Sequence, residues 1–185
     1  MSKQFTINES FSLLGKGLHT GLNIEARFLP SEENTGIIFK RVDLPGQPEI
    51  PAIATYVSAT ERGTVLKKGE AAVSTIEHIM SAFMAHGIDN CIIEVNAPEV
   101  PILDGSAKYV VEAIAKVGKK ELDAERKYYE VTEEITFTNG TSTIKLLPAN
   151  DFYAEVTVDF NSPVLKRQSA SISGFADYDK EISSA

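Results

Sequence analysis

Hydrophobic and polar residues alternate with a period of two along much of the first half of the chain. This alternation is typical of β-strands that bury one face. It covers the segments 5–7, 11–13, 23–29 and 36–42, and the apolar run 91–95 predicts a further, buried strand. Turn residues separate 23–29 from 36–42, so the simplest pairing is a hairpin of these two segments.

Two later segments carry apolar residues at helical spacing instead. In the first, the apolar stripe consists of Ile76, Ile79, Met80, Phe83 and Met84. In the second, it consists of Val110, Val111, Ile114 and Val117. Ser74 and Ser106 precede these stripes as candidate N-caps, and Gly87 and Gly118 follow them. We therefore predict helices near residues 75–85 and 107–117.

Strand patterns resume after the charged run 119–127, at residues 128–137, 143–147 and 152–160. The segment 143–160 resembles 24–44: each has a strand, Leu-Pro, a polar turn and a second strand. We predict an α+β fold, a two-layer sheet-and-helix sandwich. Residues 1–122 form a complete first domain, 123–127 a linker, and 128–185 the opening strands of a truncated second, similar domain.

Composition excludes several classes of protein. Acidic residues outnumber basic ones by 26 to 18, and no basic stripe suggests a nucleic-acid partner. The single cysteine, Cys91, allows neither an intrachain disulfide nor a thiolate zinc site. The chain has no signal peptide pattern and no apolar run of the roughly 20 residues that a transmembrane helix needs. We therefore expect a cytoplasmic location.

Glu77 and His78 are the strongest candidates for chemistry, and two interpretations are open. An imidazole can bind zinc while a neighbouring carboxylate deprotonates a metal-bound water. Alternatively, Ser74-Thr75-Ile76-Glu77 forms a capping box, in which Glu77 accepts a hydrogen bond from the Ser74 backbone. Ala82 replaces the second histidine of the His-Glu-x-x-His pattern.

Three further features are ambiguous by themselves. His86 lies about 12 Å along the helix from His78, too far to share one ion. His19 sits in a glycine-flanked turn, where a surface role is the simpler interpretation and a third ligand stays open. The segment 98–107 has two prolines and an Asp104-Gly105 turn, which fit a rigid connector between a strand and a helix.

Together these motifs resemble one family. The segments that match are Ser74–His78, Gly87–Asn90 and Pro98–Ala107, with Gly15–Gly21 and Asn34–Gly36 at the start. They are similar, at matching spacing, to the amino-terminal part of the zinc-dependent UDP-3-O-acyl-N-acetylglucosamine deacetylases of lipid A biosynthesis in Gram-negative bacteria. The resemblance implies two similar α+β domains with the active site between them.

The resemblance also implies roles for individual residues. Glu77 would be the general base and His78 a ligand of Zn²⁺. Arg62, Gly63 and His19 are assigned by their position near the site alone, as residues that would bind the UDP-linked acylated glucosamine substrate. The family's other zinc ligands and general acid lie in a His-Lys-x-x-Asp helix and a later histidine, and no segment of the chain matches them. We therefore expect this chain to be inactive alone.

Two alternatives to a single-function deacetylase stay open. The chain could be a non-catalytic binding or interaction module that keeps the fold. Its parent could also be a fusion of the deacetylase with a 3-hydroxyacyl-carrier-protein dehydratase. An incomplete second domain would leave an apolar sheet face uncovered, so self-association is expected.

Overall fold

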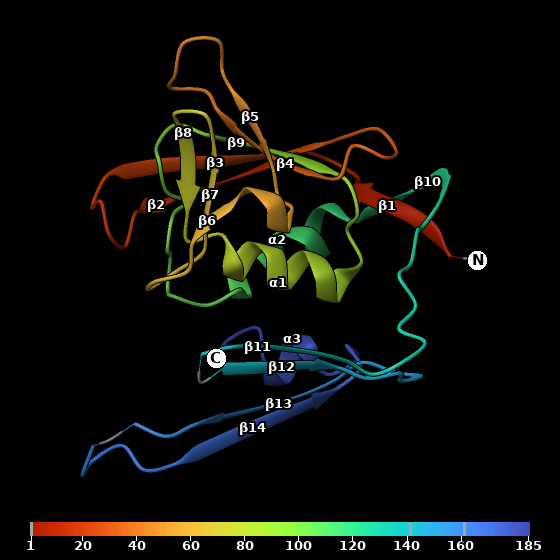
Figure 1. Ribbon diagram of the computed structural model, residues 1–185. Helices are drawn as coiled ribbons and strands as arrows, with labels where there is room; N and C mark the ends of the chain where they lie inside the picture. The colour runs from red at the N-terminus through yellow and green to blue at the C-terminus, as the bar shows by residue number, and fades with distance from the viewer. Residues whose placement is uncertain (1, 141, 161) are drawn as a thin grey trace. The chain divides into compact units, whose positions relative to one another are not determined.

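The computed structural model describes residues 2–140, 142–160 and 162–185, and the chain divides into two compact units (Figure 1). The first unit comprises the residues up to Arg126 together with Ile182–Ala185, and the second comprises Lys127–Glu181. The strands of the first unit are β1 (Lys3–Ile7), β2 (Phe11–Lys16), β3 (Asn23–Pro30), β4 (Ile37–Arg41), β5 (Glu49–Pro51), β6 (Val57–Ala59), β7 (Val65–Lys68), β8 (Ala71–Ser74), β9 (Cys91–Val95) and β10 (Lys119–Glu125). Its helices are the 3₁₀ turn η1 (Ala54–Tyr56), α1 (Glu77–His86) and α2 (Lys108–Val117).

A five-stranded sheet with the order β2-β3-β9-β4-β5 forms the centre of the first unit. Strand β9 is antiparallel to β3 and parallel to β4, so the predicted hairpin of β3 with β4 is wrong. The polar connection after Pro30 leaves room for a strand between them, and β9 fills it. Cys91, Ile93 and Val95 are fully buried there.

Helices α1 and α2 lie on the same face of this sheet, as Figure 1 shows. Ile76, Ile79 and Phe83 are almost fully buried, and the Phe83 ring meets the edge of Phe28 from β3 at 6.0 Å between centroids. The α+β fold and its sheet-and-helix layering are therefore confirmed. Met84 was assigned to the buried stripe wrongly, since it is 62% exposed.

Both helices begin slightly later than predicted. Ser74 ends β8 and its N–H donates to the carbonyl of Pro98, so it does not cap α1. Helix α1 ends as predicted, with Gly87 in the left-handed conformation. Before α2, the Ser106 hydroxyl accepts a hydrogen bond from the N–H of Lys108 at 3.3 Å.

Two smaller sheets complete the first unit. Strands β6, β7 and β8 form an antiparallel sheet, and Arg41 of β4 reaches it by donating to the Ala72 carbonyl at 2.6 Å. Strand β10 pairs with β1. Residues 123–125 of the predicted linker 123–127 therefore belong to this strand, and the two units divide after Arg126.

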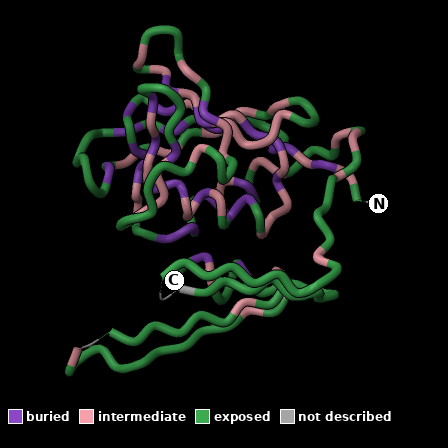
Figure 2. The backbone as a smooth tube through the Cα atoms, in the orientation of Figure 1, coloured by how far each residue is buried: buried purple, intermediate pink, exposed green. Residues whose placement is uncertain are grey.

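In its described residues, 127–140, 142–160 and 162–181, the second unit has two hairpins and a short helix. Its elements are β11 (Ile135–Asn139), β12 (Ser142–Leu146), β13 (Tyr153–Val158), β14 (Gln168–Ser173) and α3 (Tyr178–Glu181). Strand β11 pairs with β12 and β13 pairs with β14, a strand that the sequence pattern did not reveal. Most of this unit is exposed (Figure 2), including Phe137 and Ile144. That the first domain is complete and the second only begun stays a prediction.

Among the described residues, no helix has both the length and the apolar character required to cross a lipid bilayer. The cytoplasmic location stays a prediction.

Candidate active site

Glu77 and His78 are the first two residues of α1, where the chain leaves β8. Between strand and helix, Thr75 adopts a left-handed backbone with φ of 64° and is buried. This conformation is rare for a β-branched residue, and strain of this kind costs on the order of 1–3 kcal/mol. It turns the chain so that Glu77 and His78 start the helix instead of continuing the strand.

The Glu77 carboxylate is held by a neighbouring loop. One of its oxygens, Oε2, accepts the backbone N–H of Thr64 at 2.9 Å. Gly63 lies beside the carboxylate, because a Cβ built on it would be 3.4 Å from Oε1. With a φ of 146°, Gly63 also has a backbone that other residues rarely adopt. The capping-box interpretation is therefore wrong: Glu77 contacts the loop before β7 and not Ser74.

The structure brings the three predicted substrate-binding residues to this loop. The imidazole Nε2 of His19 lies 3.1 Å from the carbonyl oxygen of Arg62, and Gly63 follows it next to Glu77. Arg62 has a left-handed backbone with φ of 61° and an exposed side chain. The geometry thus places His19, Arg62 and Gly63 at the base candidate, and their contact with substrate stays a prediction.

His78 is half-buried against an apolar wall. Together with Ile79, Leu103 and Val110 it borders a cavity of about 10 Å³ between α1, α2 and the sheet, too small for more than a water molecule. Within the described residues, the imidazole of His78 forms no hydrogen bond or ion pair, and its nitrogens are not sealed off from solvent. The ring is therefore packed on one side and available to a ligand through its nitrogens.

We tested whether these residues fit the zinc ion that the resemblance implies. Catalytic zinc takes three protein ligands and leaves a position for water. In the part of the chain that the structure describes, no three His, Cys, Asp or Glu side chains gather closely enough to hold a metal. The side chain of Glu77 is bound to Thr64, and that of His19 to Arg62. The described residues therefore fit one ligand of a zinc site, His78, and not a whole site.

Sequence reasoning missed Glu99, which had been included in the rigid connector. Its side chain is fully buried, and its carboxylate accepts hydrogen bonds from His19, Thr20 and Thr75. A signal for it existed. Residues Val95, Ala97 and Glu99 are buried while Asn96 and Pro98 are exposed, so the glutamate falls on the buried phase of a short period-two pattern that ends before the buried Val100.

Comparison with known proteins identifies the family. The family described as UDP-3-O-acyl N-acetylglycosamine deacetylase, LpxC, matches residues 4–185. This chain belongs to that deacetylase family. It is 50% identical over its whole length to the bifunctional enzyme LpxC/FabZ of Porphyromonas gingivalis and 44% identical to that of Bacteroides thetaiotaomicron. It is 38% identical to the UDP-3-O-acyl-N-acetylglucosamine deacetylase of Pseudomonas entomophila.

The chain spans only part of these members of the deacetylase family. It covers 40% and 41% of the two bifunctional enzymes and 62% of the Pseudomonas deacetylase. The family is therefore assigned for these 185 residues. The activity of a full-length protein is not assigned by the comparison.

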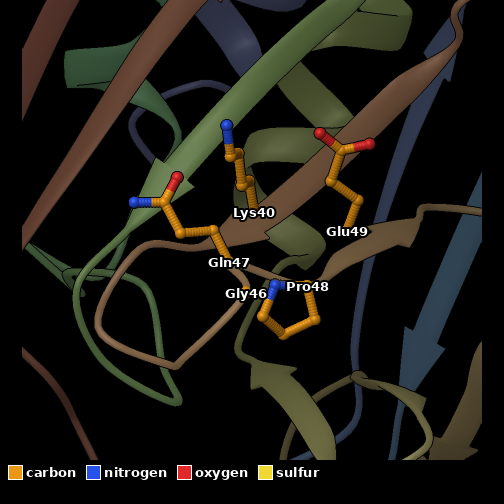
Figure 3. A pocket seen from close by; sticks show the side chains of 5 residues that line it. All are labelled: Lys40, Gly46, Gln47, Pro48 and Glu49. Carbon is orange, nitrogen blue, oxygen red and sulfur yellow. The ribbon is translucent and has the colours of Figure 1, made fainter.

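A larger hollow, of about 560 Å³, lies elsewhere on the first unit. Figure 3 shows Lys40 and Glu49 on the paired strands β4 and β5, with Gln47 from the turn between them. The hollow shares no residue with the Glu77 and His78 site. It is open and is lined by Lys40, Gly46, Gln47, Pro48 and Glu49.

Proposed function

We propose that this chain supplies the general base and one zinc ligand of a UDP-3-O-acyl-N-acetylglucosamine deacetylase. The proposal rests on two neighbouring side chains, Glu77 and His78, of which, within the described residues, one is hydrogen-bonded and the other is not. Glu77 is fixed by the Thr64 N–H, while His78 is packed on one side with its nitrogens available. The names of the relatives support the substrate, a UDP-linked 3-O-acylated N-acetylglucosamine.

The reaction is hydrolysis of the substrate's acetamide. The oxygen of water bonds to the amide carbon, the carbon–nitrogen bond breaks, and the departing nitrogen takes up a proton that the water released, so that acetate and a free amine result. Glu77 takes a proton from the attacking water. Because Oε2 is occupied by Thr64, Oε1 beside Gly63 is the oxygen that accepts this proton. A bound zinc ion would polarise the amide carbonyl and acidify the water.

The chain's own residues explain why the base is well placed. The Thr64 N–H prevents the carboxylate from rotating freely, and a general base must be held within hydrogen-bond reach of its proton. The glycine at position 63 leaves space beside Oε1 that a side chain would reduce. His78 is half-buried and borders the same small cavity as Ile79 and Leu103, and it directly follows Glu77 on α1, so a ligand at its nitrogens would lie near the base.

Substitutions in the full-length protein that carries this segment test the proposal. Glu77→Gln should keep the zinc content and lower kcat by about 10²–10⁴-fold, the usual contribution of a positioned base. His78→Ala should lose zinc and activity together. His86→Ala, at the other end of α1, is the matched control and should keep both.

The contrary outcomes are distinct. A Glu77→Gln protein with full activity and a lowered melting temperature would show that Glu77 serves only to hold the Thr64 loop. A wild-type protein without zinc or turnover would favour the non-catalytic binding module.

A further inference from the structure

Glu99 is a fully buried carboxylate that the chemistry above does not use. Its oxygens accept the N–H of His19 at 3.0 Å, the N–H of Thr20 at 3.0 Å, the Thr20 hydroxyl at 2.8 Å and the Thr75 hydroxyl at 3.1 Å. Burial alone raises the pKa of Glu99, but these hydrogen bonds together hold it below its usual value. The group is therefore a buried anion whose donors come from two separate segments.

One of these segments is the glycine-rich turn 17–21, and it approaches Glu99 very closely. A Cβ added to Gly17 would lie 2.3 Å from Glu99 Oε2 and 2.4 Å from the Thr20 hydroxyl. Only glycine fits there, so the turn is packed directly onto the carboxylate. This contact fixes the backbone of His19, whose imidazole Nε2 then meets the carbonyl of Arg62.

The other segment is Thr75, the strained residue two positions before Glu77. Its hydroxyl donates to Glu99 and its N–H donates to the carbonyl of Thr64 at 3.0 Å. A backbone conformation of this cost persists only where the surroundings determine it. Glu99 supplies part of that determination.

Two paths of hydrogen bonds connect Glu99 to the loop that holds Glu77. From Glu99, one branch passes through His19 to Arg62, and the other passes through Thr75 to Thr64. Both branches end on the loop 62–64, whose Thr64 N–H holds the Glu77 carboxylate. The Glu99 carboxylate is thus linked to both ends of the 62–64 loop, which orients Glu77.

We propose that Glu99 is a positioning residue for the deacetylation reaction, which orients Glu77 by fixing the 62–64 loop through His19 and Thr75. The proposal rests on the function proposed above. Glu99 does not touch the reacting atoms, so its effect should appear in kcat and not in zinc or substrate binding.

The experiment replaces Glu99 by glutamine in the full-length protein. The amide has the same shape but presents an NH₂ group to a cluster of donors. We expect kcat to fall by about 10–100-fold, because small displacements of a catalytic group have effects of that size, with KM and zinc content unchanged. In the amide NMR spectrum, the chemical shift of the Thr64 N–H should change, because its hydrogen bond to the Glu77 carboxylate is displaced.

Asp89→Asn is the matched control, since Asp89 is a hydrogen-bonded carboxylate on the connection after α1, away from the 62–64 loop. It accepts the N–H of Phe5 at 2.8 Å and a guanidinium N–H of Arg126 at 2.7 Å. Its loss should lower the melting temperature while kcat and the Thr64 signal stay unchanged. If Glu99→Gln behaves like Asp89→Asn, Glu99 is structural only and the proposal is overturned.

A second variant decides the matter if Glu99→Gln fails to fold. Thr75→Val keeps the branched shape and removes only the hydroxyl donor. It should lower kcat in the same way, and an unchanged kcat would overturn the proposal. The Thr64 signal separates this inference from the proposed function. If it moves in Glu99→Gln while Glu77→Gln stays fully active, the positioning holds and the role of Glu77 as base fails.

Discussion

The two units use similar hairpins and differ in what covers them. In the first, the β2–β3 and β4–β5 hairpins are joined by β9 and covered by α1 and α2, and Phe28, Phe39 and Ile93 are fully buried. In the second, the β11–β12 and β13–β14 hairpins lack a bridging strand within the described residues, and their apolar side chains are largely exposed. A strand pattern therefore specifies a hairpin, but a core requires the elements that join and cover hairpins.

The difference matters for function because the site residues belong to the covered unit. Glu77, Thr64 and Glu99 are oriented by contacts between β-strands, a helix start and a buried loop. Such precision requires side chains that are locked by packing and by a supporting shell of hydrogen bonds. Within the described residues, the second unit has one aromatic stack, between Phe152 and Phe175 at 4.7 Å, and few buried side chains.

Matched core substitutions should show the largest contrast between the units. Phe83→Ala removes a ring that is 1% exposed and should lower the free energy of unfolding by about 3–5 kcal/mol. Phe137→Ala removes a ring that is 65% exposed and should change it by no more than about 0.5 kcal/mol. Denaturant unfolding measures both. A large loss from Phe137→Ala would mean that its face is covered, for example by a second copy of the chain.

Acid should produce a smaller effect, confined to the first unit. Hydrogen bonds from Arg41 hold the pKa of Asp43 below its usual value, and the donors around Glu99 do the same for that residue. Since both pKa values are lower in the folded state, their stabilisation is complete above the ordinary carboxyl values of about 4. It is lost as the pH falls through the folded-state values.

Thermal melts between neutral pH and about pH 3 measure this effect. The melting temperature of the first unit should fall with pH, and less steeply in Glu99→Gln. Glu134→Gln is the control in the second unit. Its ion pair with Lys145, at 3.2 Å, is more than half exposed and contributes little. If the melting temperature depends on pH equally in the wild type, Glu99→Gln and Glu134→Gln, the stabilising role of the buried Glu99 carboxylate is contradicted.

Local patterns predicted the helices, their apolar faces and most strands, because these depend on spacing within one segment. The position of β9 could not be read, since a short apolar run does not say which strands it joins. Residues 123–125 were assigned to the linker 123–127 because the charges of the run 119–125 hide a weak alternation, in which Leu122 and Ala124 are half-buried and their neighbours exposed.

The geometry of the candidate site could not be predicted from the sequence. Family resemblance indicated Glu77 and His78, while the partner of Glu77 lies 13 residues earlier, at Thr64, in a contact that no local motif encodes. The capping-box interpretation failed for a backbone reason. The left-handed conformation of Thr75 ends the strand after Ser74 and delays the helix to Glu77.

The central claim is that this chain contributes the base and a single zinc ligand. Zinc titration of the 185-residue chain by calorimetry, beside a His78→Ala variant, tests it most directly. A single imidazole lacks the chelate advantage of three fixed ligands, so binding should be weak or undetectable, and no deacetylation should accompany it. Tight one-to-one binding that is lost in His78→Ala and accompanied by turnover would contradict the account, because it would mean that the chain completes the site by itself.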